Sequence, residues 1–118
     1  ETRLYLLWDG GVRTGRISMN RFVEITAAAP AKIYGLYPRK GTIAVGADAD
    51  VLVWDPEHEH SLNHSEMHMR VDYSPYEGRR VKGKASHVFS RGDLVVENGK
   101  FHGRPGRGKF QKRSSFSL

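Results

Sequence analysis

Histidines that could bind a metal are concentrated in one short segment of the chain. Four of the six lie between positions 58 and 68, and His64 and His68 stand four residues apart, as two zinc ligands on a helix do. The zinc-protease order His-Glu-x-x-His is not met, because the glutamate between His64 and His68 is Glu66, two positions after His64 and not directly after it. His58 and His60 alternate as on a strand, so the four histidines do not share one backbone geometry. We therefore expect an exposed polar segment here rather than a metal site.

Two further groups of residues have chemistry to consider. Asp48 and Asp50 could supply carboxylates to a cation, but calcium loops need more oxygen ligands and a longer spacing. Aspartates commonly hydrogen-bond to their own backbone at turns, which is the interpretation we favour. Arg91-Gly92-Asp93 matches the tripeptide of integrin ligands, yet it lies between two expected strands and is explained as a hairpin turn.

Covalent catalysis finds no support in the sequence. There is no nucleophile elbow, no phosphate-binding glycine loop and no recognisable triad motif. Cysteine is absent, which excludes disulfides and thiolate metal sites and is compatible with the cytoplasm. From the residues we predict no catalytic, cofactor-binding or metal-binding residue in this chain.

The net charge of +6 comes entirely from the last nineteen of the 118 residues. Residues 1–99 carry 13 basic and 13 acidic side chains, and residues 100–118 carry six basic and no acidic ones. The tail is too poor in large apolar residues to fold by itself, so we expect it to be disordered or ordered only against a partner. Its cations could hold nucleic-acid phosphates, face an acidic surface of a neighbouring subunit or remain solvated. Nucleic-acid binding is the least favoured of these three. The six cations are Lys100, Arg104, Arg107, Lys109, Lys112 and Arg113.

Helical patterns dominate up to about residue 40. A first helix is expected to stop at Asp9-Gly10-Gly11 and to place on one face Leu4, Leu7 and Trp8. Ser18 is the expected N-cap of a second helix, which would bury Phe22, Val23 and Ile25. Pro30 must end that helix or open another, and residues 29–35 fit a short helix that starts with this proline and is capped by Gly35.

Strand patterns follow, from Gly41 to about Phe101. Residues 42–45 form a short apolar run and residues 46–50 a turn, and a buried strand at 51–54 is expected to end at Asp55-Pro56. Residues 57–80 are polar, and they fit one irregular strand or a loop. Two short runs, 87–90 and 94–97, predict a hairpin joined by three residues, and Asn98-Gly99 predicts a second turn.

Residues 30–56 carry a resemblance to a known family. The run contains Pro-Ala-Lys at a helix start, then Lys-Gly-Thr-Ile, then Gly-Ala-Asp-Ala-Asp before Val51-Leu52-Val53-Trp54, and it resembles the C-terminal signature of amidohydrolases. The version Tyr-Pro-Arg-Lys-Gly at 37–41 is similar to that of dihydropyrimidinases and hydantoinases. Residues 71–78 resemble another stretch of this group, with Ser74 in place of the usual asparagine. Residues 1–4, 11–16, 90–96 and 106–110 also match, so the resemblance covers nearly the whole chain.

The resemblance implies a mixed α/β fragment with a division of labour. Residues 1–40 would be the closing helices of a (β/α)8 barrel that binds metal and performs the hydrolysis. Residues 41–101 would form the C-terminal strands of a β-sandwich domain. Residues 102–118 would form a basic extended tail that contacts another subunit of a homo-tetramer. The N-terminus, Glu1-Thr2-Arg3, fits a cut inside a longer chain, and we expect the isolated chain to be poorly folded or oligomeric.

The implied activity is hydrolysis of cyclic amides, dihydropyrimidines and 5-substituted hydantoins, in the cytoplasm. In that family two divalent metals, expected to be zinc, and a carboxylated lysine supply the nucleophile. The residues that hold them belong to earlier segments, so the main partner of this chain would be the missing N-terminal barrel. A non-catalytic scaffold relative and another cyclic amidohydrolase such as an allantoinase remain alternatives. No apolar run approaches the roughly 20 residues of a membrane helix.

Overall fold

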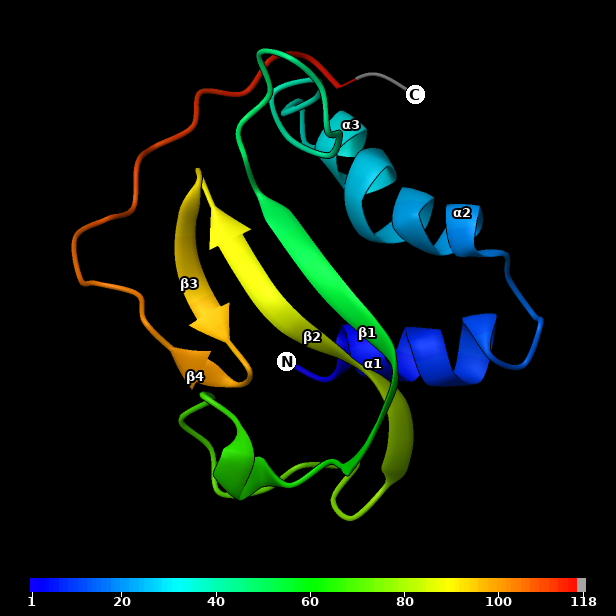
Figure 1. Cartoon of the computed structure of the whole chain (residues 1–118). Coiled ribbons are helices and arrows are strands. Elements are labelled where there is room, and N and C mark those ends of the chain that lie inside the picture. Colours follow the sequence, from blue (N-terminus) through cyan, green and yellow to red (C-terminus); the bar gives the residue numbers. More distant parts are fainter. Residues whose placement is uncertain (117–118) are drawn as a thin grey trace. The chain divides into compact units, whose positions relative to one another are not determined.

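The computed structural model describes residues 1–116 of the chain, and Figure 1 shows its helices and strands. The chain divides into two compact units. Unit 1 comprises residues 1–22 and 55–84, and unit 2 comprises residues 23–54 and the chain from Ala85 onward. Helices precede strands, as expected, and the strands form one antiparallel sheet in the order β1-β2-β3-β4. The elements are α1 (Arg3–Leu7), the π-helical turn η1 (Trp8–Val12), α2 (Met19–Val23), the π-helical turn η2 (Glu24–Ala28), α3 (Ala29–Ile33), β1 (Val51–Ser61), the 3-10 turn η3 (His64–Glu66), β2 (Arg80–Ser90), β3 (Asp93–Glu97) and β4 (Lys100–Phe101).

The first helix does not stop at Asp9-Gly10-Gly11, and that prediction is wrong. The chain continues through η1, where the Arg13 N–H donates to the Trp8 carbonyl at 3.1 Å. The Arg13 guanidinium also pairs with Asp9 at 2.5 Å across this turn. A Cβ on Gly11 would lie 3.0 Å from the side chain of Ile17. The glycine therefore allows close packing inside a helical segment, and it does not terminate the segment.

Ser18 is the N-cap of the second helix, α2, as predicted. The Ser18 Oγ accepts the N–H of Arg21 at 3.1 Å, which satisfies one unpaired donor of the first turn. Phe22 is buried and meets the Trp8 ring edge to face, with centroids 5.5 Å apart. Val23 is 54% exposed, so the prediction that it is buried is wrong. Neighbouring helical positions point about 100° apart, and the direction of Phe22 therefore turns Val23 outward.

Pro30 lies inside an uninterrupted helical run, so the expectation that it ends the second helix or opens another one is wrong. The run passes from α2 through the π-helical turn η2 into α3, with helical backbone angles at Ala28 and Ala29. Gly35 ends the segment with φ +65°. Its N–H donates to the Lys32 carbonyl at 3.1 Å, and the Leu36 N–H donates to the Ala31 carbonyl at 2.8 Å. The predicted glycine cap is thus confirmed.

Strand β1 runs through Asp55-Pro56, where the sequence predicts its end. It is an edge strand of the sheet, and an edge tolerates proline because the missing N–H can face away from the neighbouring strand. Leu52 and Val53 are 40% and 44% exposed, so this chain does not bury the strand as predicted. The preceding apolar run, 42–45, forms no strand, and its Ile43 is 85% exposed.

Both predicted turns of the later strands are present. Ser90 pairs with Asp93, so the first hairpin has a two-residue turn, Arg91-Gly92, in place of the expected three-residue connection. Both turn residues have positive φ, 50° and 83°, which matches the right-handed twist of the flanking strands. Asn98-Gly99, with φ values of 49° and 83°, joins β3 to β4 in the same way.

Residues 62–79 connect β1 to β2 and contain the most deeply buried side chain. Leu62 is 2% exposed, its N–H donates to the Arg79 carbonyl at 2.9 Å, and its carbonyl accepts the Gly78 N–H at 2.8 Å. Ser74 is also buried, and its Oγ accepts the Tyr76 N–H at 3.2 Å. The segment left open by the sequence, 57–80, is therefore the end of one strand followed by a loop closed on itself.

Candidate functional sites

The histidines of unit 1 do not assemble into a metal site. His64 and Glu77 pair at 3.1 Å, and the same carboxylate accepts the His64 backbone N–H at 2.9 Å. His68 pairs in the same manner with Glu1, at 3.0 Å through its ring and 2.6 Å through its backbone. The helical spacing is not realised because η3 ends at Glu66 and the chain then becomes extended. Each imidazole thus has its own carboxylate.

These contacts change the acidity of both carboxyl groups. The backbone hydrogen bond from His64 is the main reason that the pKa of Glu77 lies below its usual value, and the His64 ring adds to this effect. For Glu1, burial alone would raise the pKa, but the two hydrogen bonds from His68 outweigh it and lower that pKa. Both carboxylates are therefore held in their charged form.

His58 and His60 lie on β1, with ring centroids 5.7 Å apart. The ring of His60 also meets the ring of Tyr5 edge to face, with centroids 5.1 Å apart. Burial lowers the pKa of His60, and the charge of Lys84 and the neighbouring His58 lower it further. A histidine kept neutral in this way packs against α1.

Among residues 1–116 no three histidine or carboxylate side chains are arranged to hold a metal ion. Another pair of histidines, missed in the sequence, lies in unit 2, where His87 and His102 approach the two oxygens of Glu97 at 3.7 and 3.8 Å. Antiparallel pairing explains this contact, because His87 stands opposite Glu97 in the register of β2 and β3. The contact of His87 with Glu97 is a cross-strand side-chain pair, and such pairs stabilise a sheet modestly.

A shallow depression in unit 1 is lined by charged side chains of both signs. Asp9 accepts the N–H of Lys82 at 3.1 Å as well as the Arg13 guanidinium, and the Lys82 ammonium pairs with Glu57 at 2.5 Å. Arg80 and Glu59 approach to 3.7 Å on its rim. Sequence reasoning missed this group because its members come from three separated elements. Its charges pair with one another, which makes it a structural network. The lining residues are Asp9, Arg13, Glu59, Arg80, Val81 and Lys82.

The two aspartates of the Gly46–Asp50 turn belong to an ion-pair cluster in unit 2. Asp48 accepts from the Lys40 ammonium at 2.8 Å and from Arg39 at 3.3 Å, and Lys40 also pairs with Asp50. The Arg91 backbone N–H donates to Asp50 at 2.8 Å. The expected bonds to their own backbone are thus replaced by contacts with residues up to 41 positions away. We call Lys40, Asp48 and Asp50 the Lys40 clamp.

The clamp shifts the pKa of each member towards its charged form. The hydrogen bond from Lys40 is the main cause of the lowered pKa of Asp48. Burial opposes ionisation of Asp50, but hydrogen bonds from Lys40 and from the Arg91 amide prevail, and its pKa is lowered as well. Burial would also lower the pKa of Lys40, yet its two carboxylate partners raise it. The clamp fixes the loop before β1 to the hairpin turn of β2 and β3.

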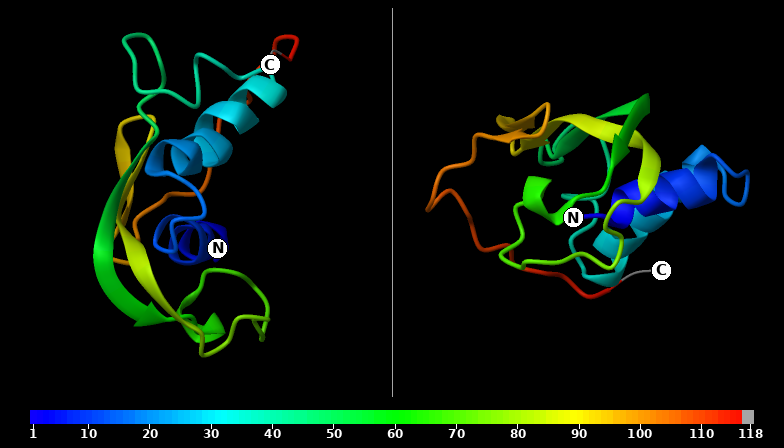
Figure 2. Two further views of the ribbon diagram at one scale, coloured as in Figure 1. Left: turned by 90° about the vertical axis from the view of Figure 1, so that its right-hand side faces the viewer. Right: turned by 90° about the horizontal axis from the view of Figure 1, so that it is seen from below.

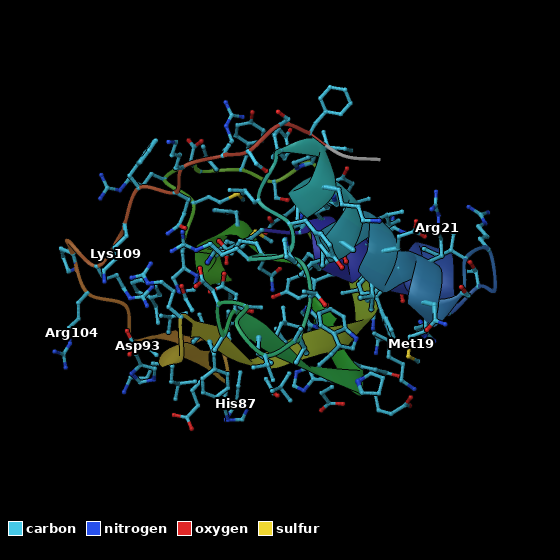
Figure 3. All side chains as sticks on the ribbon, turned by 90° about the horizontal axis from the view of Figure 1, so that it is seen from above. Met19, Arg21, His87, Asp93, Arg104 and Lys109 are labelled. Atoms are coloured by element: carbon cyan, nitrogen blue, oxygen red, sulfur yellow. The ribbon has the colours of Figure 1, made fainter. Side chains whose placement is uncertain are left out.

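The basic tail is extended, without helix or strand from residue 102 to residue 116, and its last two residues lie outside the described part of the chain. The expectation that it needs a partner to become ordered is corrected by contacts within unit 2. The Arg107 guanidinium pairs with Asp93 at 3.1 Å. Arg104 lies on the outer side of the tail (Figure 3). It is exposed, and within the described residues it has no ion pair; the same holds for Lys109, Lys112 and Arg113.

No helix in residues 1–116 is long and apolar enough to cross a membrane.

Comparisons with known proteins agree closely with one another. The profile of the Amidohydrolase family matches residues 1–95. A D-hydantoinase from Ralstonia pickettii is 48% identical over 116 residues, which is 98% of this chain and 25% of that protein. The solved D-hydantoinase of a Bacillus species is 47% identical with a TM-score of 0.93, and the dihydropyrimidinase of Brevibacillus agri is 46% identical with a TM-score of 0.94. Both superpositions cover 98% of this chain and 25% of the other.

The chain thus spans about a quarter of the length of the relatives it matches. Because the family profile covers most of the sequence, this chain belongs to the Amidohydrolase family.

Proposed function

We propose that this chain is the C-terminal quarter of a cytoplasmic hydrolase that opens cyclic amide rings of the hydantoin and dihydropyrimidine class. The observation that carries the proposal is the 48% identity to a D-hydantoinase across 98% of the chain. In such a reaction the oxygen of water adds to a ring carbonyl carbon, the carbon–nitrogen bond breaks, and the nitrogen leaves with a proton. The names of the relatives favour hydantoins and dihydropyrimidines over allantoin as the substrate, and an enzyme over a scaffold.

Three structural roles follow along the chain. Residues 1–40 would close a (β/α)8 barrel, residues 41–101 would complete a β-sandwich, and residues 102–118 would contact another subunit of a tetramer. The order of elements supports this division, since α3 ends at Ile33 and β1 begins at Val51. The exposed cations of the tail suit a contact with an acidic surface.

Apolar side chains support the idea that unit 2 is completed by the missing part of the protein. Ile43 and Val45 are 85% and 109% exposed, and Leu52 and Val53 on β1 are also exposed. Contiguous exposed apolar patches commonly mark an interface. We infer that these four side chains, Ile43, Val45, Leu52 and Val53, would be buried when the longer protein is assembled.

The proposed enzyme would use two divalent metals, expected to be zinc, together with a carboxylated lysine. Donors in the described part of this chain do not fit such a centre, because no three histidine or carboxylate ligands converge there. His64 and His68 form separate pairs with Glu77 and Glu1. We therefore assign no catalytic step to this chain. Its contribution would be to support the barrel that performs the chemistry.

A chimera tests this proposal. The corresponding quarter of the Ralstonia pickettii D-hydantoinase is replaced by residues 1–118 of this chain, and hydantoin opening is measured. We expect the chimera to open hydantoin, because the exchanged segments are 48% identical over 116 residues. The same enzyme truncated before this quarter is the control, and it should be inactive or insoluble.

Two outcomes would contradict the proposal. A chimera that folds and assembles but opens no hydantoin would remove the assignment to this class of hydrolase. Hydantoin opening by the isolated 118-residue chain would show that catalysis does not depend on the missing part.

A further inference from the structure

Beyond His102, whose N–H donates to the Val95 carbonyl at 2.9 Å, the tail is attached to the rest of unit 2 at two further points. Figure 2 shows it as a long segment without helix or strand after β4. One attachment lies at Arg107 and the other at Ser114. The six residues between these points, 108–113, have no described bond to the body of unit 2.

The first attachment is charge-assisted. The Arg107 guanidinium donates to the Ser90 carbonyl at 2.6 Å and to the Asp93 carboxylate at 3.1 Å. The Arg91 guanidinium in turn donates to the Arg107 carbonyl. Hydrogen bonds with an ionised partner are roughly twice as strong as neutral ones. Three groups of the β2–β3 turn therefore hold one residue of the tail.

The second attachment uses the backbone at the end of α3. The N–H and the hydroxyl of Ser114 both donate to the Gly35 carbonyl, at 2.9 and 3.1 Å. A Cβ on Gly35 would overlap the backbone of Ser114. Gly35 is thus needed twice, for its φ of +65° and for the close approach of the tail.

We propose that residues 107–114 form a two-point strap on unit 2, which presents residues 108–113 as a preformed basic loop. Once one end is attached, the other end searches a small volume, so each attachment lowers the entropic cost of the other. The loop carries Lys109, Lys112 and Arg113, together with Phe110, which is 93% exposed.

The strap bears on how the tail would meet another subunit, and this consequence rests on the proposed function. A flexible tail loses conformational entropy when it binds, whereas a loop already held at both ends has lost most of it beforehand. The contact proposed for residues 102–118 would then be made by a surface that exists before the partner arrives.

Hydrogen exchange on the full chain, read by mass spectrometry of short peptides, tests the strap. We expect the Ser114 amide to exchange at least about tenfold more slowly than its intrinsic rate, because it is bonded to Gly35. Arg107→Gln removes the first attachment and should accelerate this exchange at least about threefold. Arg104→Gln is the matched control, since it makes the same substitution three residues earlier at a cation without a described contact, and it should change nothing.

The amides of the β2–β3 hairpin report that unit 2 is folded in every variant. The strap is refuted if Ser114 exchanges at its intrinsic rate while the hairpin is protected, or if Arg104→Gln and Arg107→Gln have the same effect. The strap is also refuted if neither the Ser114 amide nor the β2–β3 hairpin is protected in the unsubstituted chain, because the hairpin to which Arg107 binds is then not folded. The readout is independent of ring opening, so its failure is distinct from failure of the chimera.

Discussion

Among the described residues, unit 1 buries more apolar side chains than unit 2 does. Unit 1 contains four of the buried apolar side chains found in residues 1–116, namely Trp8, Phe22, Leu62 and Val81. In the described part of unit 2, Ala31 is the buried apolar side chain, and larger ones such as Ile43 and Val45 are exposed. Both units contain ion pairs, so unit 2 relies in larger proportion on polar contacts, such as the Lys40 clamp and the attachments of the tail at Arg107 and Ser114.

The difference predicts unequal stability. Burial of an aliphatic or aromatic side chain contributes roughly 1.5–3 kcal/mol, whereas an exposed ion pair contributes between about 0 and 1 kcal/mol. Unit 1 therefore has a core of its own, and unit 2 depends on contacts that a larger assembly would supplement. This asymmetry accords with a chain that spans a quarter of its relatives.

The largest predicted difference between the units is in the free energy of unfolding lost when one leucine in each unit is replaced by alanine. Leu62→Ala in unit 1 should lower the free energy of unfolding by about 2–5 kcal/mol, because the side chain is 2% exposed and leaves a cavity. Leu52→Ala in unit 2 should cost less than about 1 kcal/mol in this chain, since Leu52 is already 40% exposed. Urea unfolding of both variants measures the difference.

The same two substitutions can also be made in the chimera, to test whether the missing part of the protein covers Leu52. Leu52→Ala should then become more costly than in the isolated chain, because the added three quarters would cover β1. Equal costs for Leu52 in both contexts would argue against a covering surface.

Loss of the Lys40 clamp should lower the free energy of unfolding by less than the Leu62→Ala substitution does. Lys40→Gln leaves Asp48 and Asp50 without their ammonium partner, and we expect a loss of about 0.5–1 kcal/mol in the free energy of unfolding. Arg39→Gln is the control, because the Arg39 side chain is 55% exposed and its contact with Asp48 is longer, at 3.3 Å. A thermal unfolding series in low salt measures both, and an equal loss in the two variants would contradict a central role for Lys40.

Local chemistry in the sequence was enough to predict several of these features. Ser18 caps a helix and Gly35 ends one because their side chains, or lack of one, act on the nearest backbone groups. Asn98-Gly99 forms a tight turn for the same reason, since few other residue pairs adopt two positive φ values.

Features that depend on distant partners were not predictable from local patterns. Asp50 bonds to the Arg91 amide, 41 residues away, and Pro56 continues a strand because that strand lies at the edge of the sheet. The prediction that Leu52 is buried is wrong for this chain. An apolar run indicates that a strand packs against something, but it does not show whether the partner lies in the same chain. The candidate sites share this limit, since their charged groups meet only after the chain has folded.

As pH falls, the two units should begin to lose stability at different pH values. In unit 2 the carboxyl pKa values of Asp48 and Asp50 are lowered by Lys40, so the clamp is intact above the unfolded value of about 4 and is lost only as pH falls through the lower folded values. In unit 1 the pKa values of the Glu77 and Glu1 carboxyl groups are lowered as well, but His60 takes up its proton at higher pH than any of these carboxylates. Its pKa is lowered mainly by burial.

The smallest predicted effect is the response of unit 1 between pH 7.5 and 5.5. Burial, with the charge of Lys84, keeps the pKa of His60 below its unfolded value of about 6.5, and Glu66 opposes this only in part. The unfolded chain therefore takes up the proton first, and stability falls as pH drops from above 7 towards the folded pKa. We expect a small fall in Tm over this interval, because one histidine titrates and the lowering of its pKa is partly opposed.

His60→Phe keeps an aromatic ring against Tyr5 and removes the titrating group, so the Tm of this variant should depend less on pH than that of the unsubstituted chain. His64→Phe makes the same substitution at an exposed ring paired with Glu77, and it should leave the contribution of His60 in place. If both variants lose the same part of the pH dependence, the contact between His60 and α1 is not its source. If only His60→Phe flattens the profile, acid destabilises unit 1 through its core-facing histidine, well above the pH at which the carboxylates of unit 2 are protonated.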